Sequence, residues 1–307
     1  MALAGIHHIT AVTADADSNI SFYTKTMGMR MVKLTVNFDQ PSSYHLYFGD
    51  RTGAPGSVLT FFHWPQMPRW RKGTGQVSAV CFSVPDESLD FWEKRLNFFG
   101  VRLRKEERFG KEILSFSDPE GLSLEICGGA DKDEQGWGGD VPREHSIRGF
   151  GGAALSEEGY EKTAGFVSGI LGFAGAEGDG ERSRYGAGND FIDIFCRPDS
   201  PRGIVGAGSV HHIAFRTSDD GSQADWRRRL VSAGLDVTPV IDRHYFHSIY
   251  FREPGGVLFE IATDGPGFLI DEKEGELGSS LKLPPWLERR RSELESFLPP
   301  LRIRGGK

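Results

Sequence analysis

The stretch RHYFHSIYFREPGGVLFEIA, residues 243–262, contains two strand-like runs on either side of a tight turn. Aromatic and branched apolar residues fill both runs, and Pro254, Gly255 and Gly256 separate them, so the pattern predicts a β-hairpin. Glu260 lies inside the apolar second run, where an unpaired ionised carboxylate would cost several kcal/mol. The sequence therefore predicts that a cation or a hydrogen-bonding partner faces Glu260.

Two histidine pairs suggest that this partner is a metal ion. The run GIHHITAV contains His7 and His8, and the run SVHHIAFRT contains His211 and His212. Both runs have the composition of strands. Two imidazoles and one carboxylate that converge from strands form a facial triad, which holds an octahedral ion and leaves positions open. We expect His8, His212 and Glu260 to be the three metal ligands.

Length and composition restrict the class of protein. With 307 residues the chain is long enough for two domains and a full hydrophobic core. A formal charge of −7 argues against a nucleic-acid partner, and no apolar run approaches the about 20 residues that span a bilayer. The sparse cysteines, Cys81, Cys127 and Cys196, predict buried thiols in a reducing compartment. We therefore expect a cytoplasmic protein that binds neither nucleic acid nor membrane.

One plan is repeated four times along the chain. In each repeat a strand is followed by an amphipathic helix and then by further strand-like runs, and a glycine ends each helix. The terminating glycines are Gly28, Gly100, Gly172 and Gly234, which give a repeat of roughly 60–70 residues. The sequence predicts an α+β fold in which four βαβββ modules pair into two cup-shaped mixed β-sheets.

The repeats differ in their polar residues. SFSDPEGLSLEI in the second repeat resembles YFREPGGVLFEI in the fourth, which gives Glu125 the position of Glu260, but no histidine opens the second repeat. The third repeat has neither the histidine pair nor the glutamate. Because His8 belongs to the first repeat and the other two ligands to the fourth, a shared ion requires these repeats to meet. We expect them to form one cup, and the second and third repeats to form another without a metal. Consecutive pairing, with His8 crossing between domains or subunits, is the alternative.

The domain boundaries follow from the repeats. We expect two modules in residues 1–145, two modules in residues 146–263, and a tail in residues 264–307. An apolar pattern in the tail predicts one helix that begins near Pro284 and docks on a domain. The apolar face of this helix consists of Trp286, Leu287, Leu294 and Phe297. A dimerising arm in a homo-oligomer is the alternative role of the tail.

These motifs resemble those of a known superfamily. HHIT in the first repeat, and HHIAF and LFEIA in the last, are similar to motifs of the vicinal oxygen chelate superfamily, which includes glyoxalases, bleomycin-resistance proteins and extradiol dioxygenases. More narrowly, GIHHIT, YHLYFGD and RHYFHSIYFREPGGVLFEIATDGPGF resemble ring-cleaving dioxygenases that act on hydroquinones rather than catechols. The resemblance covers nearly the whole chain. HHIT is shared by many members, whereas the stretch 243–268 is more specific.

The resemblance implies an extradiol-type ring-cleaving dioxygenase, an oxidoreductase of aromatic compound degradation. Its partners would be a small aromatic substrate and O2, and its product would be an open-chain semialdehyde acid. By position, the iron ligands of the family fall on His8, His212 and Glu260, the same three residues that the strand pattern selects. The implied cofactor is iron(II), with manganese(II) as an alternative.

The same resemblance implies catalytic roles for His211, Arg243, Tyr250 and Thr10. Each of the first three also has a structural interpretation: His211 as an outward strand residue, Arg243 as a surface cation and Tyr250 as a core aromatic. Thr10 shares a face of its strand with His8, because alternate residues of a strand point the same way. The further residues expected around the pocket are His45, His247, Tyr245, Phe246, Phe61 and Phe62.

Two other functions remain open at this point. A glyoxalase-like lyase or isomerase would use a redox-inert ion and typically a fourth protein ligand, and the chain offers only Phe61 or Phe62 where the first repeat would supply one. A binding protein could instead sequester a small aromatic or an antibiotic without turnover. Oxygen consumption with hydroquinone separates these functions from a dioxygenase.

Overall fold

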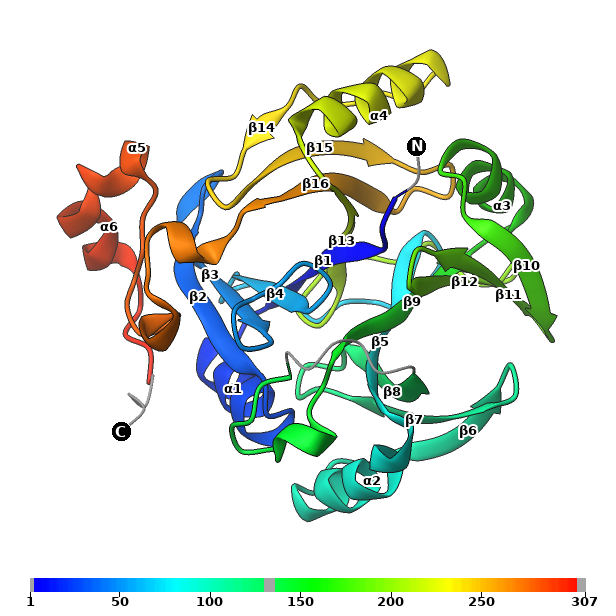
Figure 1. The fold of residues 1–307 in the computed structure, drawn as a ribbon, viewed down its shortest axis with the longest axis horizontal. Coiled ribbons are helices and arrows are strands. Elements are labelled where there is room, and N and C mark those ends of the chain that lie inside the picture. Colours follow the sequence, from blue (N-terminus) through cyan, green and yellow to red (C-terminus); the bar gives the residue numbers. More distant parts are fainter. Residues whose placement is uncertain (1–2, 130–135, 303–307) are drawn as a thin grey trace.

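The computed structural model describes residues 3–129 and 136–302, whose elements follow one another as four βαβββ modules (Figure 1). The first module consists of β1 (Ile6–Thr13), α1 (Ala16–Ser21), η1 (Phe22–Thr26), β2 (Arg30–Asn37), β3 (Gln40–Gly49) and β4 (Val58–His63). The second module consists of β5 (Gln76–Pro85), η2 (Asp86–Ser88), α2 (Leu89–Phe98), β6 (Arg104–Arg108), β7 (Lys111–Ser117) and β8 (Ser123–Gly129). The short helix η3 (Arg143–His145) precedes the third module.

The second half of the chain repeats this order. The third module consists of β9 (Gly149–Glu157), α3 (Glu161–Gly165), η4 (Phe166–Ile170), β10 (Ala174–Asp179), β11 (Arg182–Ala187) and β12 (Asp190–Cys196). The fourth module consists of β13 (Val210–Thr217), α4 (Asp220–Ser232), β14 (Ile241–Asp242), β15 (Phe246–Arg252) and β16 (Leu258–Pro266). The predicted glycines follow the four module helices, with positive φ angles of 63°, 72°, 75° and 85° at Gly28, Gly100, Gly172 and Gly234.

The modules pair as the ligand positions predict. The first sheet has eight strands in the order β14-β15-β16-β13-β1-β4-β3-β2, so it joins the fourth module to the first. The second sheet, β10-β11-β12-β9-β5-β8-β7-β6, joins the third module to the second. Strands β1 and β13 pair antiparallel at the junction of the first sheet, as β5 and β9 do in the second. The predicted fold class is confirmed. Each sheet contains strands from both sides of residue 145. The proposed domain boundaries stay a prediction.

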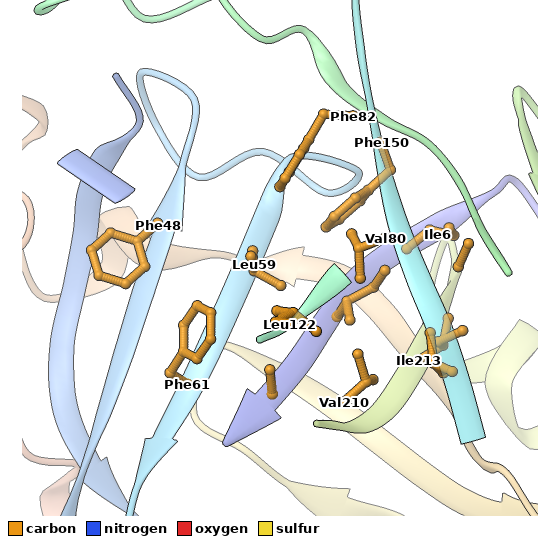
Figure 2. Packing of buried hydrophobic residues seen from close by; sticks show 14 of the residues in the cluster. Ile6, Phe48, Leu59, Phe61, Val80, Phe82, Leu122, Phe150, Val210 and Ile213 are labelled. Atoms are coloured by element: carbon orange, nitrogen blue, oxygen red, sulfur yellow. The ribbon is translucent and has the colours of Figure 1, made fainter. Parts of the chain in front are cut away.

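Apolar side chains join the two sheets. Ile9 of β1 and Ile213 of β13 are fully buried on one face, and Val80 of β5 belongs to the same apolar cluster. Figure 2 shows labelled side chains of β1, β4 and β13 packed beside those of β5 and β9. Because neighbouring residues of a strand point to opposite faces, burying Ile9 directs His8 away from this core and into the cup of the first sheet.

The tail differs from its prediction. In place of one helix it forms two short ones, α5 (Pro285–Glu288) and α6 (Arg291–Phe297), after the turns η5 (Phe268–Ile270) and η6 (Glu274–Glu276). The chain leaves helical geometry at Arg290, so the helical spacing does not continue from one helix to the next. The predicted apolar face is therefore divided: Leu287 and Leu294 are buried, whereas Trp286 and Phe297 are exposed.

The tail packs against the edge of the first sheet. The backbone N–H of Lys282 donates to the carbonyl of Leu34 in β2 at 2.9 Å, and the hydroxyl of Tyr44 in β3 donates to the carbonyl of Pro299 at 3.0 Å. Figure 1 shows α5 and α6 beside β2 and β3. The tail therefore covers an edge strand that would otherwise present unpaired backbone groups. Among the described helices, none is long and apolar enough to cross a membrane.

Candidate metal centre

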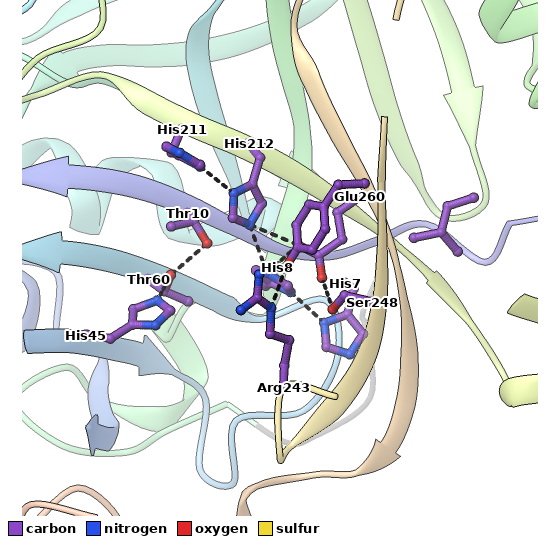
Figure 3. A network of polar contacts seen from close by, with 12 residues as sticks. His7, His8, Thr10, His45, Thr60, His211, His212, Arg243, Ser248 and Glu260 are labelled. Carbon is purple, nitrogen blue, oxygen red and sulfur yellow. Dashed lines mark hydrogen bonds and ion pairs between the residues drawn. The ribbon is translucent and has the colours of Figure 1, made fainter. Parts of the chain in front are cut away.

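Three side chains converge in the cup of the first sheet. The Nε2 atoms of His8 and His212 lie 3.3 Å apart, and the Oε2 atom of Glu260 lies 3.5 Å from the first and 3.0 Å from the second. All three side chains are buried, and Figure 3 shows them pointing toward one another from β1, β13 and β16. In the described part of the chain, they are the one cluster of histidine, cysteine, aspartate or glutamate that could hold an ion.

The geometry fits a divalent ion. Three ligand atoms on one face of an octahedron with bonds of about 2.1 Å lie about 3 Å apart, which is close to the observed triangle. Oε1 of Glu260 accepts a hydrogen bond from the Ser248 hydroxyl at 2.5 Å, whereas Oε2 faces only the two imidazoles. Burial alone would raise the pKa of Glu260, but His8 and His212 hold that pKa well below its usual value. An anionic carboxylate beside two imidazoles is the donor set of the predicted triad.

A β-bulge explains why both histidines of each pair approach the site. His7 is the extra residue between the pairs Ile6–Phe215 and His8–Ala214, and His211 is the extra residue on the opposite strand. The Nδ1 atom of His7 lies 2.9 Å from Nδ1 of His8, and Nδ1 of His211 lies 2.8 Å from Nδ1 of His212. Bulges often re-aim side chains next to active sites. His7 and His211 thus contact the Nδ1 atoms of His8 and His212, whose Nε2 atoms are left directed at the site.

The histidines around the triad are neutral. Burial, reinforced by His8, lowers the pKa of His7 to about 3, and burial with the neighbouring His212 lowers the pKa of His211 to about 3. Burial also lowers the pKa of His212, against the opposing effect of Glu260. Neutral imidazole is the form that ligates metals, so desolvation prepares the site for an ion.

Arg243 and Tyr250 form a connected pair at the cavity wall. The Arg243 guanidinium donates from Nε to the Tyr250 hydroxyl oxygen at 3.1 Å and from Nη1 to Asp39 at 3.0 Å. Burial raises the pKa of Tyr250, and Glu260 raises it further, so the phenol keeps its proton. Tyr250 lies directly opposite Glu260 in the β15–β16 pair. This pairing places the Tyr250 side chain beside the triad.

A second polar chain comes from the first module. The hydroxyl of Thr10 lies 2.8 Å from the hydroxyl of Thr60, which in turn lies 2.8 Å from Nε2 of His45. The Tyr47 hydroxyl continues the chain at 2.8 Å from Nδ1 of His45 (Figure 3 shows the portion up to His45). This chain fixes the Thr10 hydroxyl two residues beyond His8 on the same strand face.

The two chains border one cavity of about 400 Å³. All four residues with predicted catalytic roles line it, together with two of the three triad residues; they are Thr10, His211, Arg243, Tyr250, His8 and His212. Among the other residues expected there, His45, Phe62 and Phe246 are on the wall. Tyr245, Phe61 and His247 do not line the cavity. The first two are fully buried in apolar clusters, and His247 bonds Asp220 at 2.6 Å away from the cavity.

The internal repeat corrects the expected position of a fourth ligand. Glu260 pairs with Ala214, the second residue after His212, and the matching pair in the first module is Thr60 with Thr10. Thr60, rather than Phe61 or Phe62, therefore occupies the position of a fourth ligand. Its hydroxyl is already engaged by two neighbours. The first module therefore has a hydroxyl where the fourth module has a carboxylate, and three protein ligands remain.

The second cup keeps the acids of the repeat but not its histidines. Glu125 pairs with Cys81 in β5, as predicted from its motif, and Asp193 pairs with Ala154 in β9. The third repeat lacks the glutamate, as expected, but it has an aspartate at the position of Glu260. Arginines neutralise both acids: Arg108 bonds Glu125 at 3.2 and 2.7 Å, and Arg184 bonds Asp193 at 2.7 and 2.8 Å. A guanidinium thus takes the place that an ion would need.

Sequence reasoning missed four residues that shape the site. These are His7, Tyr47, Thr60 and Ser248. His7 could have been found, because it opens the same HH motif as His211. The other three carry no local signal, since hydroxyl groups in strands are common and only strand pairing shows which acid or histidine they face.

Comparison with known proteins gives a consistent result. The family model of the Glyoxalase/Bleomycin resistance protein/Dioxygenase superfamily matches residues 5–86 and 76–261. A Bacillus subtilis protein provisionally named ring-cleaving dioxygenase MhqO is 45% identical over 304 residues, which cover 98% of this chain and 97% of that protein. The chlorohydroquinone/hydroquinone 1,2-dioxygenase of Sphingobium indicum is 36% identical over 94% of both chains. A crystal structure of a Bacillus subtilis protein, provisionally titled a dioxygenase, matches with a TM-score of 0.94, 44% identity and 99% coverage of both chains.

Proposed function

Because this chain belongs to the Glyoxalase/Bleomycin resistance protein/Dioxygenase superfamily, we propose that it is a ring-cleaving dioxygenase that inserts O2 into a hydroquinone-type aromatic. The proposal is supported above all by one observation. Two imidazole nitrogens and one carboxylate oxygen converge beside a cavity, in a chain whose full-length relatives are named dioxygenases. In this proposal the cleavage is of the extradiol type and the product is an open-chain semialdehyde acid.

The proposed cofactor is iron(II), with manganese(II) as the alternative. His8, His212 and Glu260 would hold it, because their donor atoms form one triangular face and leave the opposite positions to ligands. A bound iron(II) would supply the ability to pass electron density from an electron-rich ring to oxygen, which a redox-inert ion such as magnesium does not have.

Metal ligation by His212 would determine the tautomers of His211 and His212. A histidine that ligates through Nε2 carries its proton on Nδ1, so His212 donates from Nδ1 to Nδ1 of His211. The proton of neutral His211 is then on Nε2. His211 therefore presents a donor on the cavity wall, where it can bond a substrate oxygen.

Tyr250 and Arg243 act on the same substrate oxygen in this proposal. Because the Tyr250 hydroxyl oxygen accepts from Arg243, its own proton is free to be donated into the cavity. The guanidinium charge favours negative charge that develops on the oxygen. Asp39 holds the far side of Arg243, which keeps the guanidinium directed at Tyr250. Tyr250 thus donates a hydrogen bond to the substrate oxygen, and Arg243 stabilises the negative charge that develops there.

Thr10 would bond the substrate from the other side of the cavity. If Tyr47 donates to Nδ1 of His45, His45 donates from Nε2 to Thr60, and Thr60 donates to Thr10. The proton of Thr10 then points into the cavity. The direction of hydrogen bonding along this chain of neutral groups thus orients the Thr10 hydroxyl as a donor to the substrate.

The cavity supports a flat and compact substrate. Its apolar wall includes Phe62, Trp64, Phe246 and Leu258, and its volume of about 400 Å³ is in the lower part of the range for small-molecule sites. A single aromatic ring would contact these side chains with its faces, while its hydroxyl reaches the triad.

The glyoxalase-like alternative is less well supported. Such chemistry typically uses a fourth protein ligand, and Thr60 at that position is hydrogen-bonded to Thr10 and His45. A hydroxyl is a weaker ligand than a carboxylate. A binding protein without turnover has no specific observation in its favour.

Metal analysis with oxygen uptake tests the proposal. The protein is purified without oxygen, its iron and manganese are measured, and oxygen uptake is recorded with hydroquinone, with catechol and with the glutathione adduct of methylglyoxal. We expect about one metal ion per triad and uptake with hydroquinone that exceeds uptake with catechol. Conversion of the glutathione adduct without oxygen uptake would establish the glyoxalase-like reaction instead. Tight binding of hydroquinone with no uptake, in iron-loaded protein, would establish a binding protein.

A further inference from the structure

A pair of thiols lies in the second cup, outside the candidate metal centre. Cys81 of β5 and Cys127 of β8 are buried, and the S–H of Cys81 donates to the sulfur of Cys127 across 3.2 Å. Both are free cysteines. A separation of 46 positions hides this contact in the sequence, where each cysteine is an ordinary candidate for a buried thiol. The parallel pairing of their strands brings the two sulfurs together.

A glycine packs closely against the two sulfurs. A Cβ atom at Gly151 would lie 2.7 Å from the sulfur of Cys127 and 3.5 Å from the sulfur of Cys81. Gly151 is the bulged residue of β9, at the position that His211 has in the first sheet. Any other residue there would press on Cys127. The absence of a side chain lets the two sulfurs lie close against the backbone of β9.

Cys127 also borders a large cavity. Its sulfur-bearing side chain lines a space of about 870 Å³ between the two sheets, whereas Cys81 lies behind it and is 1% exposed. Ile113, Gly151 and Phe191 line the same wall, and so do the cations Lys111 and Arg184. Small solutes can therefore approach Cys127 first. Cys81 is reached through Cys127.

The surroundings favour the thiolate of Cys127 over that of Cys81. The hydrogen bond from Cys81 lowers the pKa of Cys127, and the positive charges of Arg184 and Lys111 lower it further, against burial and the charge of Glu125. The same hydrogen bond and burial raise the pKa of Cys81. The pair therefore has an attacking sulfur at the cavity and a protonated sulfur behind it, as in known dithiol redox pairs.

We propose that Cys127 and Cys81 are a redox-active thiol pair, in which Cys127 reacts with small hydroperoxides from the cavity and Cys81 resolves the product to a disulfide. The site is independent of the candidate metal centre, because it uses none of its residues and lies in the other sheet. Its ligand class is a small neutral two-electron oxidant such as hydrogen peroxide. The pair would be a modification site that the dioxygenase proposal does not need.

The chemistry balances in two steps. The Cys127 thiolate attacks one peroxide oxygen, an S–O bond forms, the O–O bond breaks, and the departing hydroxide takes a proton to become water. The Cys81 sulfur then attacks the Cys127 sulfur, the S–O bond breaks, and hydroxide leaves with the Cys81 proton as a second water. Two thiols are oxidised to one disulfide while one peroxide is reduced to two waters. The sulfurs must approach by about 1.1 Å to reach the disulfide distance of about 2.05 Å.

Cys196 provides the internal control. It is more exposed than either paired cysteine, and its thiol donates to the carbonyl of Glu158 at 3.7 Å. If exposure alone governed oxidation, Cys196 would react first. If the pair is redox-active, Cys127 reacts first, at a rate about tenfold or more above that of Cys196.

Peptide mapping after limited oxidation tests this inference. The full-length reduced protein is treated with a few equivalents of hydrogen peroxide and a chelator, then alkylated and digested. We expect a peptide containing the disulfide between Cys81 and Cys127, a mass loss of about 2 Da that dithiothreitol reverses, and unmodified Cys196. In the C81S variant, a sulfenic acid on Cys127 should be trapped by dimedone, and in the C127S variant neither Cys81 nor Cys196 should react in the same time.

Two results would overturn the inference. One is oxidation of Cys196 before Cys127 in the wild-type protein. The other is the absence of a disulfide between Cys81 and Cys127 until the protein unfolds, as followed by circular dichroism in the same samples. Both are measured on the wild-type chain, so they hold even if a serine variant fails to fold.

Discussion

Replacement of Glu260 by glutamine removes the charge of the proposed ligand while keeping its shape. The carboxylate is 0% exposed, and its Oε2 atom faces only the Nε2 atoms of His8 and His212. Loss of a partner that merely orients a ligand typically weakens metal affinity about 10–100-fold, so loss of a direct ligand should cost at least about 100-fold. Glu260→Gln should therefore bind iron(II) poorly and lose oxygen uptake.

The size of the effect can be worked out as a stability difference. At a free iron(II) concentration about 100 times the wild-type dissociation constant, binding stabilises the folded wild type by about 2.7 kcal/mol. A 100-fold weaker site at the same concentration gains only about 0.4 kcal/mol. Anaerobic urea unfolding with and without iron(II) measures both increments. The comparison within each variant cancels any effect of the substitution on the metal-free protein.

Glu125→Gln is the matched control. Glu125 has the equivalent position in the second module, but both of its oxygens accept from Arg108. This variant should lose stability without metal, because it leaves a buried guanidinium without its anion, and yet keep the full iron(II) increment. The assignment of the functional module would be refuted if Glu125→Gln lost the increment and Glu260→Gln kept it.

The other predictions concern the cavity wall and the contact between modules. Tyr250→Phe should keep its metal but lower kcat/KM about 10²–10⁴-fold, and activity within twofold of wild type would show that the phenol is structural. Thr60→Val should lower kcat/KM about tenfold at unchanged metal content by breaking the chain to Thr10, with Thr60→Ser as the variant that restores it. Burial and the neighbouring Glu253, against the opposing charge of Arg202, raise the pKa of Glu157 from 4.5 to about 8. Because the folded state holds this proton more tightly, the free energy of unfolding should fall as the pH rises from about 4.5 to about 8. The urea midpoint of Glu157→Gln, measured over the same pH range, should lack this part of the decline.

The arginine pairs of the second cup explain why only one cup is a candidate metal centre. Each acid at the position of Glu260 is matched by a bidentate guanidinium, and the histidine positions are taken by Ala79 and by Gly152. Restoring a histidine there would not create a site, because the acid is already neutralised. The two cups therefore share a backbone plan while differing in the chemistry of a few strand positions.

The sequence by itself determined the modules, their order and the choice of three converging residues. Alternation of apolar side chains and glycines after the helices are local signals, so the four modules and their helices could be located without knowledge of their neighbours. The position of His8 in the first repeat, and of His212 and Glu260 in the fourth, also determined which repeats must pair if one ion is shared. The sheet order agrees with that requirement.

Only the tertiary structure decided how neighbours across strands meet. The bulges at His7 and His211 place adjacent histidines in contact, which strict strand alternation does not predict. The register of β1 with β4 puts Thr60, rather than an adjacent phenylalanine, opposite Thr10, and a shift of one residue would turn every side chain to the other face. The pairing of Cys81 with Cys127 depends in the same way on distant segments. Contacts of this kind depend on register and packing, which no local pattern of residues encodes.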